Sequence, residues 1–207
     1  PAFIANRIGV YGIMKVLDSM RKLGLNIDEV DKLTGPVIGR PKSATFRTTD
    51  LVGLDTMIKV ATNLNKALPN DEERDRFIVP DSLIKMEQQK WLGDKTGQGF
   101  YKKTKSSKGE TEILTLDLNT LAYGPKAKAK FATLEGTKSI DNLKQRLPVL
   151  LAGTDKAGEF YRDSFYSIFS YVSNRIPEIA DELYKIDDAV CAGFGWELGP
   201  FETWDAV

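Results

Sequence analysis

The sequence contains no histidine, although ordinary composition would place about four in a chain of 207 residues. This absence excludes an imidazole general base, an imidazole metal ligand and a serine–histidine triad. The single cysteine, Cys191, excludes an internal disulfide and favours a reducing compartment, so a cytoplasmic protein is expected.

Long apolar runs and an excess of charge of one sign are also missing. No stretch of about 18 apolar residues is present, which argues against a transmembrane helix. The 29 basic residues balance 29 acidic ones, so composition does not point to nucleic acid or an anionic membrane as a partner. No metal-ligand pattern occurs, and no G-x-G-x-x-G turn follows a predicted strand, so a dinucleotide-binding domain is not expected within these residues.

The residues that are present predict a mainly α protein. Residues 3–23 carry apolar positions at helical spacing and are followed by Gly24, a typical helix stop. Asn26 followed by Glu29 is a capping-box pattern for a second helix. Residues 156–173 form an aromatic-rich helix suited to a core or an interface, and "TEILTLDL" predicts one short strand or hairpin arm.

Two loops have more than one interpretation. "TTDLVGLDT" predicts the restart of a helix, with Thr48, Thr49 or Asp50 as candidate caps. "GDKTGQGFYKK" is either a structural turn that docks Phe100 and Tyr101 onto the core, or a phosphate cradle with Lys95 as its cation. The structural interpretation is favoured, because the loop lacks the G-x-x-x-x-G-K-[ST] order. The following "KTKSSKG" is polar and is expected to be mobile.

An internal repeat is visible. The segments that begin at Ile27 and Ile186 share Ile-Asp at an offset of 159, and a Phe-x-x-x-Asp pattern at residues 46–50 recurs at 201–205 with an offset of 155. A four-residue insertion within "GRPKSATF" reconciles the two offsets. The period is far too long for a solenoid, so duplication of a small helical domain is predicted. The position corresponding to Asn6 in the second copy is Phe165, so a polar task at Asn6 would belong to the first copy alone.

Three stretches together resemble the C-terminal helical domain of 3-hydroxyacyl-CoA dehydrogenases: "FIANRI", "TTDLVGLDT" and "KMEQQKWLGDKTGQGFYKK". The later "GWELGPFETWDAV" resembles the glycine–proline turn of the same family. The resemblance implies a helical fold of the 6-phosphogluconate-dehydrogenase C-terminal type, duplicated in tandem. It divides the chain into a first domain at residues 1–103, a linker with a short strand and helices at 104–154, and a truncated second domain at 155–207.

The resemblance also implies a function. Family members oxidise L-3-hydroxyacyl-CoA with NAD in fatty acid β-oxidation, and their nicotinamide site and His–Glu pair lie in a preceding Rossmann domain. The sequence holds no such domain and begins without Met, so we expect an excised piece that is inactive by itself and holds no cofactor. The implied partners are the acyl-CoA substrate, the missing upstream domain, a fused enoyl-CoA hydratase and a second copy in a homodimer.

The resemblance assigns roles to particular residues. Asn6 matches the family's asparagine near the reacting acyl group, while Arg7 is expected to form an ion pair or a packing contact. Lys42, Ser43 and Lys95 are candidate substrate-binding residues. The basic clusters "KKTKSSK" and "KAKAK" either contribute to a CoA site or, as favoured, form solvated surface. Two rival interpretations stay open: a helical oligomerisation module without a ligand, and another hydroxy-acid dehydrogenase of the same superfamily.

Overall fold

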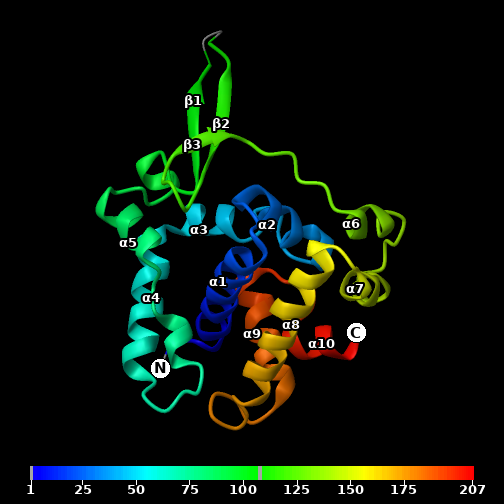
Figure 1. Cartoon of the computed structure of the whole chain (residues 1–207). Coiled ribbons are helices and arrows are strands. Elements are labelled where there is room, and N and C mark those ends of the chain that lie inside the picture. The colour runs from blue at the N-terminus through cyan, green and yellow to red at the C-terminus, as the bar shows by residue number, and fades with distance from the viewer. Residues whose placement is uncertain (1, 107–108) are drawn as a thin grey trace.

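The computed structural model describes residues 2–106 and 109–207 and confirms a mainly helical protein with one small sheet (Figure 1). Two residues of the predicted mobile stretch, Ser107 and Lys108, lie outside the described residues. The α-helices in the described residues are α1 (Ile4–Leu23), α2 (Ile27–Leu33), α3 (Phe46–Val52), α4 (Leu54–Ala67), α5 (Asp81–Gln88), α6 (Ala132–Gly136), α7 (Leu143–Ala152), α8 (Lys156–Ser173), α9 (Leu183–Phe194) and α10 (Pro200–Asp205). Short 3-10 helices are η1 (Pro36–Ile38), η2 (Arg74–Phe77) and η3 (Asp94–Thr96).

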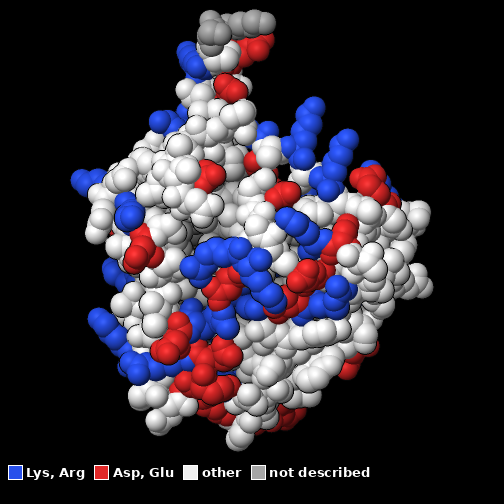
Figure 2. All heavy atoms as spheres, in the orientation of Figure 1, with Lys and Arg blue, Asp and Glu red and all other residues white. Residues whose placement is uncertain are grey.

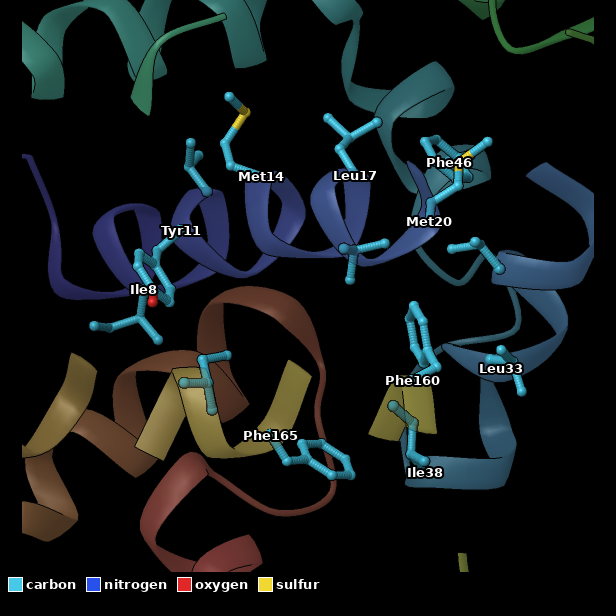
Figure 3. Close-up of a cluster of buried hydrophobic side chains, with 14 of the residues drawn as sticks. Ile8, Tyr11, Met14, Leu17, Met20, Leu33, Ile38, Phe46, Phe160 and Phe165 are labelled. Atoms are coloured by element: carbon cyan, nitrogen blue, oxygen red, sulfur yellow. The ribbon is translucent and has the colours of Figure 1, made fainter. Parts of the chain in front are cut away.

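Helix α1 is the centre of the molecule, because it lies between α4 on one side and α8 and α9 on the other (Figure 1). Figure 3 shows Met14 and Leu17 on one side of α1 and Ile8 and Tyr11 on the opposite side, and all four side chains are buried. A Cβ added at Gly9 would lie 2.1 Å from the ring of Phe194. Glycine therefore allows α9, from the C-terminal part of the chain, to approach α1 closely.

The local signals at the ends of the first two helices are confirmed. Gly24 follows α1 in the left-handed region, with a φ of 61°, which glycine adopts without steric cost. The side chain of Asn26 accepts the N–H of Glu29, and the Glu29 carboxylate accepts the N–H of Asn26. This capping box starts α2 as the sequence predicts.

The sheet is antiparallel, with strand order β1–β2–β3. Its strands are β1 (Tyr101–Lys105), β2 (Thr111–Leu116) and β3 (Tyr123–Pro125), and the β1–β2 hairpin projects from the helical body (Figure 1). The predicted strand at "TEILTLDL" is β2. Strand β1 was not predicted because "YKKTK" carries little apolar alternation; its pairing with β2 decides its conformation.

The predicted helix start at Thr48, Thr49 or Asp50 is wrong. Helix α3 begins before these residues, at Phe46, and Gly53 with a φ of 103° separates it from α4. Asp50 lies within α3, where its carboxylate accepts the N–H groups of Phe100 and Tyr101 at 2.9 Å each. The donors belong to a segment about 50 residues later in the chain, so no local sequence pattern reveals this contact.

Two aspartates make similar hydrogen bonds in the two halves of the chain. Asp31 of α2 accepts N–H groups at the start of α3, including that of Phe46, and Asp187 of α9 accepts the N–H of Phe201 in α10. This pattern aligns Asp187 with Asp31 rather than with Asp28, so the apparent insertion shrinks from four residues to one. The duplication itself stays a prediction.

Candidate functional site

Asn6 lies in the first turn of α1 and its side chain is partly exposed. In the described parts of the chain, the Asn6 amide makes no hydrogen bond to another residue. An asparagine amide offers two donors and one acceptor oxygen, so it is free to bind a ligand. A position near the reacting acyl group, which the resemblance implies for Asn6, stays a prediction.

The side chain of Arg7, the next residue, is buried and makes all its hydrogen bonds within the protein. It is 1% exposed and donates to Tyr171 Oη at 3.0 Å, Asp71 Oδ2 at 2.7 Å and Glu178 Oε1 at 2.5 Å. The prediction that Arg7 forms ion pairs is confirmed. These bonds tie the first turn of α1 to Asp71 in the turn before η2, to Tyr171 of α8 and to Glu178 after α8, and so hold the backbone beside Asn6.

A second buried arginine extends this ion-pair network. Arg175 pairs with Asp71 at 3.1 Å, with Glu72 at 2.5 Å and with Glu178 at 2.8 Å. Burial alone would raise the pKa of Asp71, but hydrogen bonds from Tyr171 and Arg7 outweigh it and lower the pKa below its usual 3.8. Asp71 is therefore ionised near neutral pH.

The face of α1 that carries Asn6 is partly exposed at Asn6 itself. Closer to the C-terminal end of the helix, at Gly9 and Ile13, the loop at residues 39–46 lies beside this face. Asn6, Gly9 and Ile13 are spaced at i, i+3 and i+7, so they share one face of the helix. Gly9 and Ile13 line a crevice of about 40 Å³ together with residues of that loop. The other lining residues are Gly12, Arg40, Pro41, Ala44, Thr45, Thr48, Phe194 and Trp196.

Ser43 does not line this crevice but contacts Thr48, which does. Its hydroxyl is 2.7 Å from the hydroxyl of Thr48, which lines the crevice and donates in turn to the carbonyl of Ala44 at 2.5 Å. Ser43 is partly buried and can still accept a hydrogen bond. The role of Ser43 in substrate binding therefore stays a prediction.

Lys42 faces a different and larger groove, of about 1180 Å³. The groove lies between α2, the hairpin, the extended residues 126–130 and α6, and Figure 2 shows basic side chains gathered below the hairpin. Its lysines without an ion pair in the described residues are Lys32, Lys42, Lys103, Lys126, Lys128 and Lys130. The tertiary structure thus gathers "KAKAK", part of "KKTKSSK" and Lys42 on one surface, which the sequence alone did not show.

Lys95, in the turn at residues 93–99, lines neither hollow, although its neighbours Asp94 and Gly97 line the larger groove; it is exposed and forms an ion pair with Asp55. The backbone of this turn rests against Asp50, and the residue that closes it, Phe100, is buried. The structural interpretation of the turn is therefore confirmed. A role of Lys95 in substrate binding stays a prediction.

Sequence reasoning missed Arg40 and Trp196. The guanidinium of Arg40 lies 3.8 Å from the centroid of the Trp196 ring, and both residues line the crevice. Since 155 residues separate them, no local pattern could pair them. Neither a cluster of three or more metal-ligating residues nor a helix long and apolar enough to span a membrane occurs in the part of the chain that the structure describes.

Comparison with known proteins identifies relatives of similar sequence. The "Probable 3-hydroxyacyl-CoA dehydrogenase" of Bacillus subtilis is 45% identical over 207 residues, which are 100% of this chain and 26% of that protein. A protein of the same name from Deinococcus radiodurans is 50% identical over 115 residues, covering 56% of this chain and 32% of the relative. A "Putative fatty acid oxidation complex trifunctional enzyme" of Rickettsia felis is 29% identical over 98% of this chain and 26% of its own length.

The chain thus spans about a quarter of the length of the first of these relatives. The family described as "3-hydroxyacyl-CoA dehydrogenase, C-terminal domain" matches residues 3–103, which include Asn6, the loop at 39–46 and the turn at 93–99. Helices α1 to α5 and the start of the hairpin fall within this match. Residues 3–103 thus match the family of C-terminal domains of 3-hydroxyacyl-CoA dehydrogenase, and the relative from Bacillus subtilis extends the similarity to the whole of this chain.

Proposed function

We propose that the chain is the C-terminal helical part of an NAD-dependent L-3-hydroxyacyl-CoA dehydrogenase of fatty acid β-oxidation. In this proposal it forms one wall of the acyl-CoA cleft, and the NAD site and the catalytic base lie in a Rossmann domain on other residues. The family match and the names of the relatives support the enzyme class. The lack of histidine agrees with a base supplied from elsewhere.

The observation that carries the proposal is the contrast between Asn6 and Arg7. Arg7 anchors the first turn of α1 through buried ion pairs, while the neighbouring Asn6 leaves its amide unused and partly exposed. A neutral amide on an anchored turn of helix can donate a hydrogen bond to a thioester or 3-keto oxygen, where negative charge develops during the reaction. Asn6 would therefore act as a binding and polarising group.

The proposal ranks three candidate substrate-binding residues by how well their positions suit that role: Lys42, Ser43 and Lys95. Lys42, beside the lysines of the basic groove, suits the phosphates of CoA, because unpaired cations favour anions. Ser43 would support the crevice wall through Thr48. Lys95 would have to leave Asp55 to reach a substrate, so it is the weakest of the three candidates.

The second part of the chain, from about residue 155, would act as a scaffold. Helices α8 and α9 cover α1, and they would bury the face through which a second copy would otherwise associate. A Rossmann domain upstream and a fused enoyl-CoA hydratase belong to the same proposal, and a homodimer would have to form through a surface other than the covered face of α1. The trifunctional enzyme named among the relatives is compatible with the hydratase.

The test compares Asn6→Ala with a matched control, Asn63→Ala, on the exposed side of α4. Both changes would be made in the dehydrogenase that contains the chain, and NADH formation from 3-hydroxybutyryl-CoA would be followed. Loss of a preorganised donor should lower kcat by about 100-fold or more without changing the affinity for NAD, while the control should match wild type. An Asn6→Ala enzyme with unchanged kcat would overturn the proposal.

The chain by itself should form no NADH from the same substrate, because the hydride acceptor and the base are held elsewhere. Titration with acetoacetyl-CoA should still perturb the backbone amide of Asn6 in a two-dimensional NMR spectrum. If no residue of α1 responds, the rival interpretation of a ligand-free helical module gains support. Turnover by the chain alone would refute the proposed division of labour.

A further inference from the structure

The side chain of Arg40 has an unusual environment. It is half-buried, its guanidinium carbon lies over the Trp196 ring at 3.8 Å from the centroid, and within residues 2–106 and 109–207 it makes no hydrogen bond or ion pair with another side chain. Glu197 follows Trp196, and its N–H donates to the carbonyl of Gly39 at 2.8 Å. Its carboxylate nevertheless forms no ion pair with Arg40.

This environment leaves a positive charge without a counter-ion. Burial lowers the pKa of Arg40 to about 10, and no carboxylate offsets the cost. Stacking on an indole ring compensates for part of this cost, but it uses the face of the guanidinium and not its edge. The five N–H donors at the edge remain available, in a planar arrangement that matches a carboxylate or a phosphate.

The position of Arg40 relates it to Asn6. Arg40 lines the crevice together with Gly9 and Ile13. These two residues follow Asn6 by three and seven positions, which corresponds to about 5 to 10 Å along the axis of α1. The surrounding walls are largely apolar, because Pro41, Ala44, Phe194 and Trp196 contribute to them. A low-dielectric wall strengthens the attraction between Arg40 and an anion.

From these observations we infer that Arg40 binds an oxyanion of the ligand that occupies the Asn6 face of α1. The inference rests on the proposed function for the identity of this ligand, an acyl-CoA. The oxyanion is a phosphate of the CoA moiety or a carboxylate on the acyl chain, since both accept two parallel N–H bonds. Trp196, which follows α9, holds the guanidinium in place, so the C-terminal part of the chain contributes to ligand recognition.

The experiment uses the 207-residue chain and its Arg40→Gln and Arg40→Lys variants. The first probes are inorganic phosphate and succinate, and the readout is the indole N–H signal of Trp196, which is assigned by its loss in Trp196→Phe. Both probes should shift this signal in the wild-type chain, and Arg40→Gln should weaken their binding about tenfold or more. Arg40→Lys keeps the charge but loses the bidentate geometry, so its affinity should be intermediate. Glu197→Gln, the matched control on the neighbouring residue, should bind at least as tightly as wild type.

Three acyl thioesters then distinguish the two sources of the oxyanion. Acetoacetyl-CoA carries phosphates, acetoacetyl-pantetheine carries no charge, and an acyl-CoA with a terminal carboxylate carries both kinds of oxyanion. If Arg40 binds a CoA phosphate, Arg40→Gln should weaken both CoA esters and leave the pantetheine ester unchanged. If Arg40 binds an acyl carboxylate, the same change should weaken the carboxylated ester alone.

The outcomes separate this inference from the proposed function. Unchanged affinity of Arg40→Gln for phosphate, succinate and all three thioesters would overturn the inference, provided that circular dichroism shows a native fold. An equal loss in Glu197→Gln would also overturn it. If the oxyanions bind through Arg40 while no thioester binds, the oxyanion site stands and the acyl-CoA proposal fails. If thioester binding depends on Asn6 and no probe depends on Arg40, the acyl-CoA proposal stands and the oxyanion site at Arg40 fails.

Discussion

Replacing Asp71 with asparagine tests whether the buried ion-pair network holds the start of α1. The Asp71 carboxylate is 1% exposed and accepts hydrogen bonds from Arg7, Tyr171 and Arg175. Asparagine keeps the size of the side chain but removes the charge, so two buried guanidinium groups lose one counter-ion. Breaking a buried ion pair costs about 3 to 5 kcal/mol.

The expected loss lies at the lower end of this range. Glu178, which is 43% exposed, still pairs with both arginines, and Glu72, which is 48% exposed, still pairs with Arg175. We therefore expect Asp71→Asn to lower the free energy of unfolding by about 3 kcal/mol. For a chain of this size, that corresponds to a fall in Tm of about 6 to 12 °C.

The measurement is thermal and urea unfolding followed by circular dichroism, with Glu135→Gln as the control. Glu135 also forms an ion pair, with Lys138, but both side chains are more than half exposed, so the control should unfold like wild type. A destabilisation by Asp71→Asn of less than about 1 kcal/mol would refute the reasoning, because the buried network would then contribute no more than an exposed pair.

The pH dependence gives a second check on the same variant. Because the folded protein holds the pKa of Asp71 below its unfolded value of 3.8, the contribution of this carboxylate to stability is fully present above that pH. It is lost as the pH falls through the lower, folded pKa. The stability difference between wild type and Asp71→Asn should therefore close in acid; a difference that persists would contradict this assignment.

Two further substitutions test the packing of the fold. Asp50→Ala should abolish the hydrogen-exchange protection of the two backbone amides that Asp50 binds, at a cost of about 1 to 3 kcal/mol for each unpaired amide. Asp205 is exposed and corresponds to Asp50 in the internal repeat, so Asp205→Ala should leave the hydrogen-exchange protection of backbone amides unchanged. If Asp205→Ala reduced amide protection as much as Asp50→Ala, the special role of Asp50 would be refuted. Gly9→Ala should lower stability by about 1 to 3 kcal/mol because the new methyl group meets an aromatic ring of α9. Gly136→Ala, which meets nothing within 4 Å, should not destabilise the chain in urea unfolding, and a loss as large as that of Gly9→Ala would show that close packing is not the cause.

Helix boundaries with short-range signals could be predicted from the sequence. The turn from α1 to α2 depends on Gly24, Asn26 and Glu29, and all three act within a few residues of their own positions. The periodic aromatic residues of α8 likewise needed no distant partner to be recognised. Such signals depend on the backbone of one turn of helix, so sequence order is enough to read them.

Strand β1 and the role of Asp50 could not be predicted in this way. The sequence of β1 is rich in lysine and becomes a strand because β2 pairs with it. Asp50 looked like a cap because aspartate favours helix starts, but its hydrogen-bond donors come from residues 100 and 101. In both cases a tertiary partner overrides the local preference.

The sequence by itself determined the helical class, the family resemblance and the candidate Asn6. The tertiary structure decided the surroundings of that residue: Arg7 is joined to Asp71, Tyr171 and Glu178, and these partners are 64 to 171 residues away in the chain. It also decided which cations pair and which stay unpaired. Charges and buried amides find their partners by proximity in space, which depends on how the helices pack and not on their spacing along the chain.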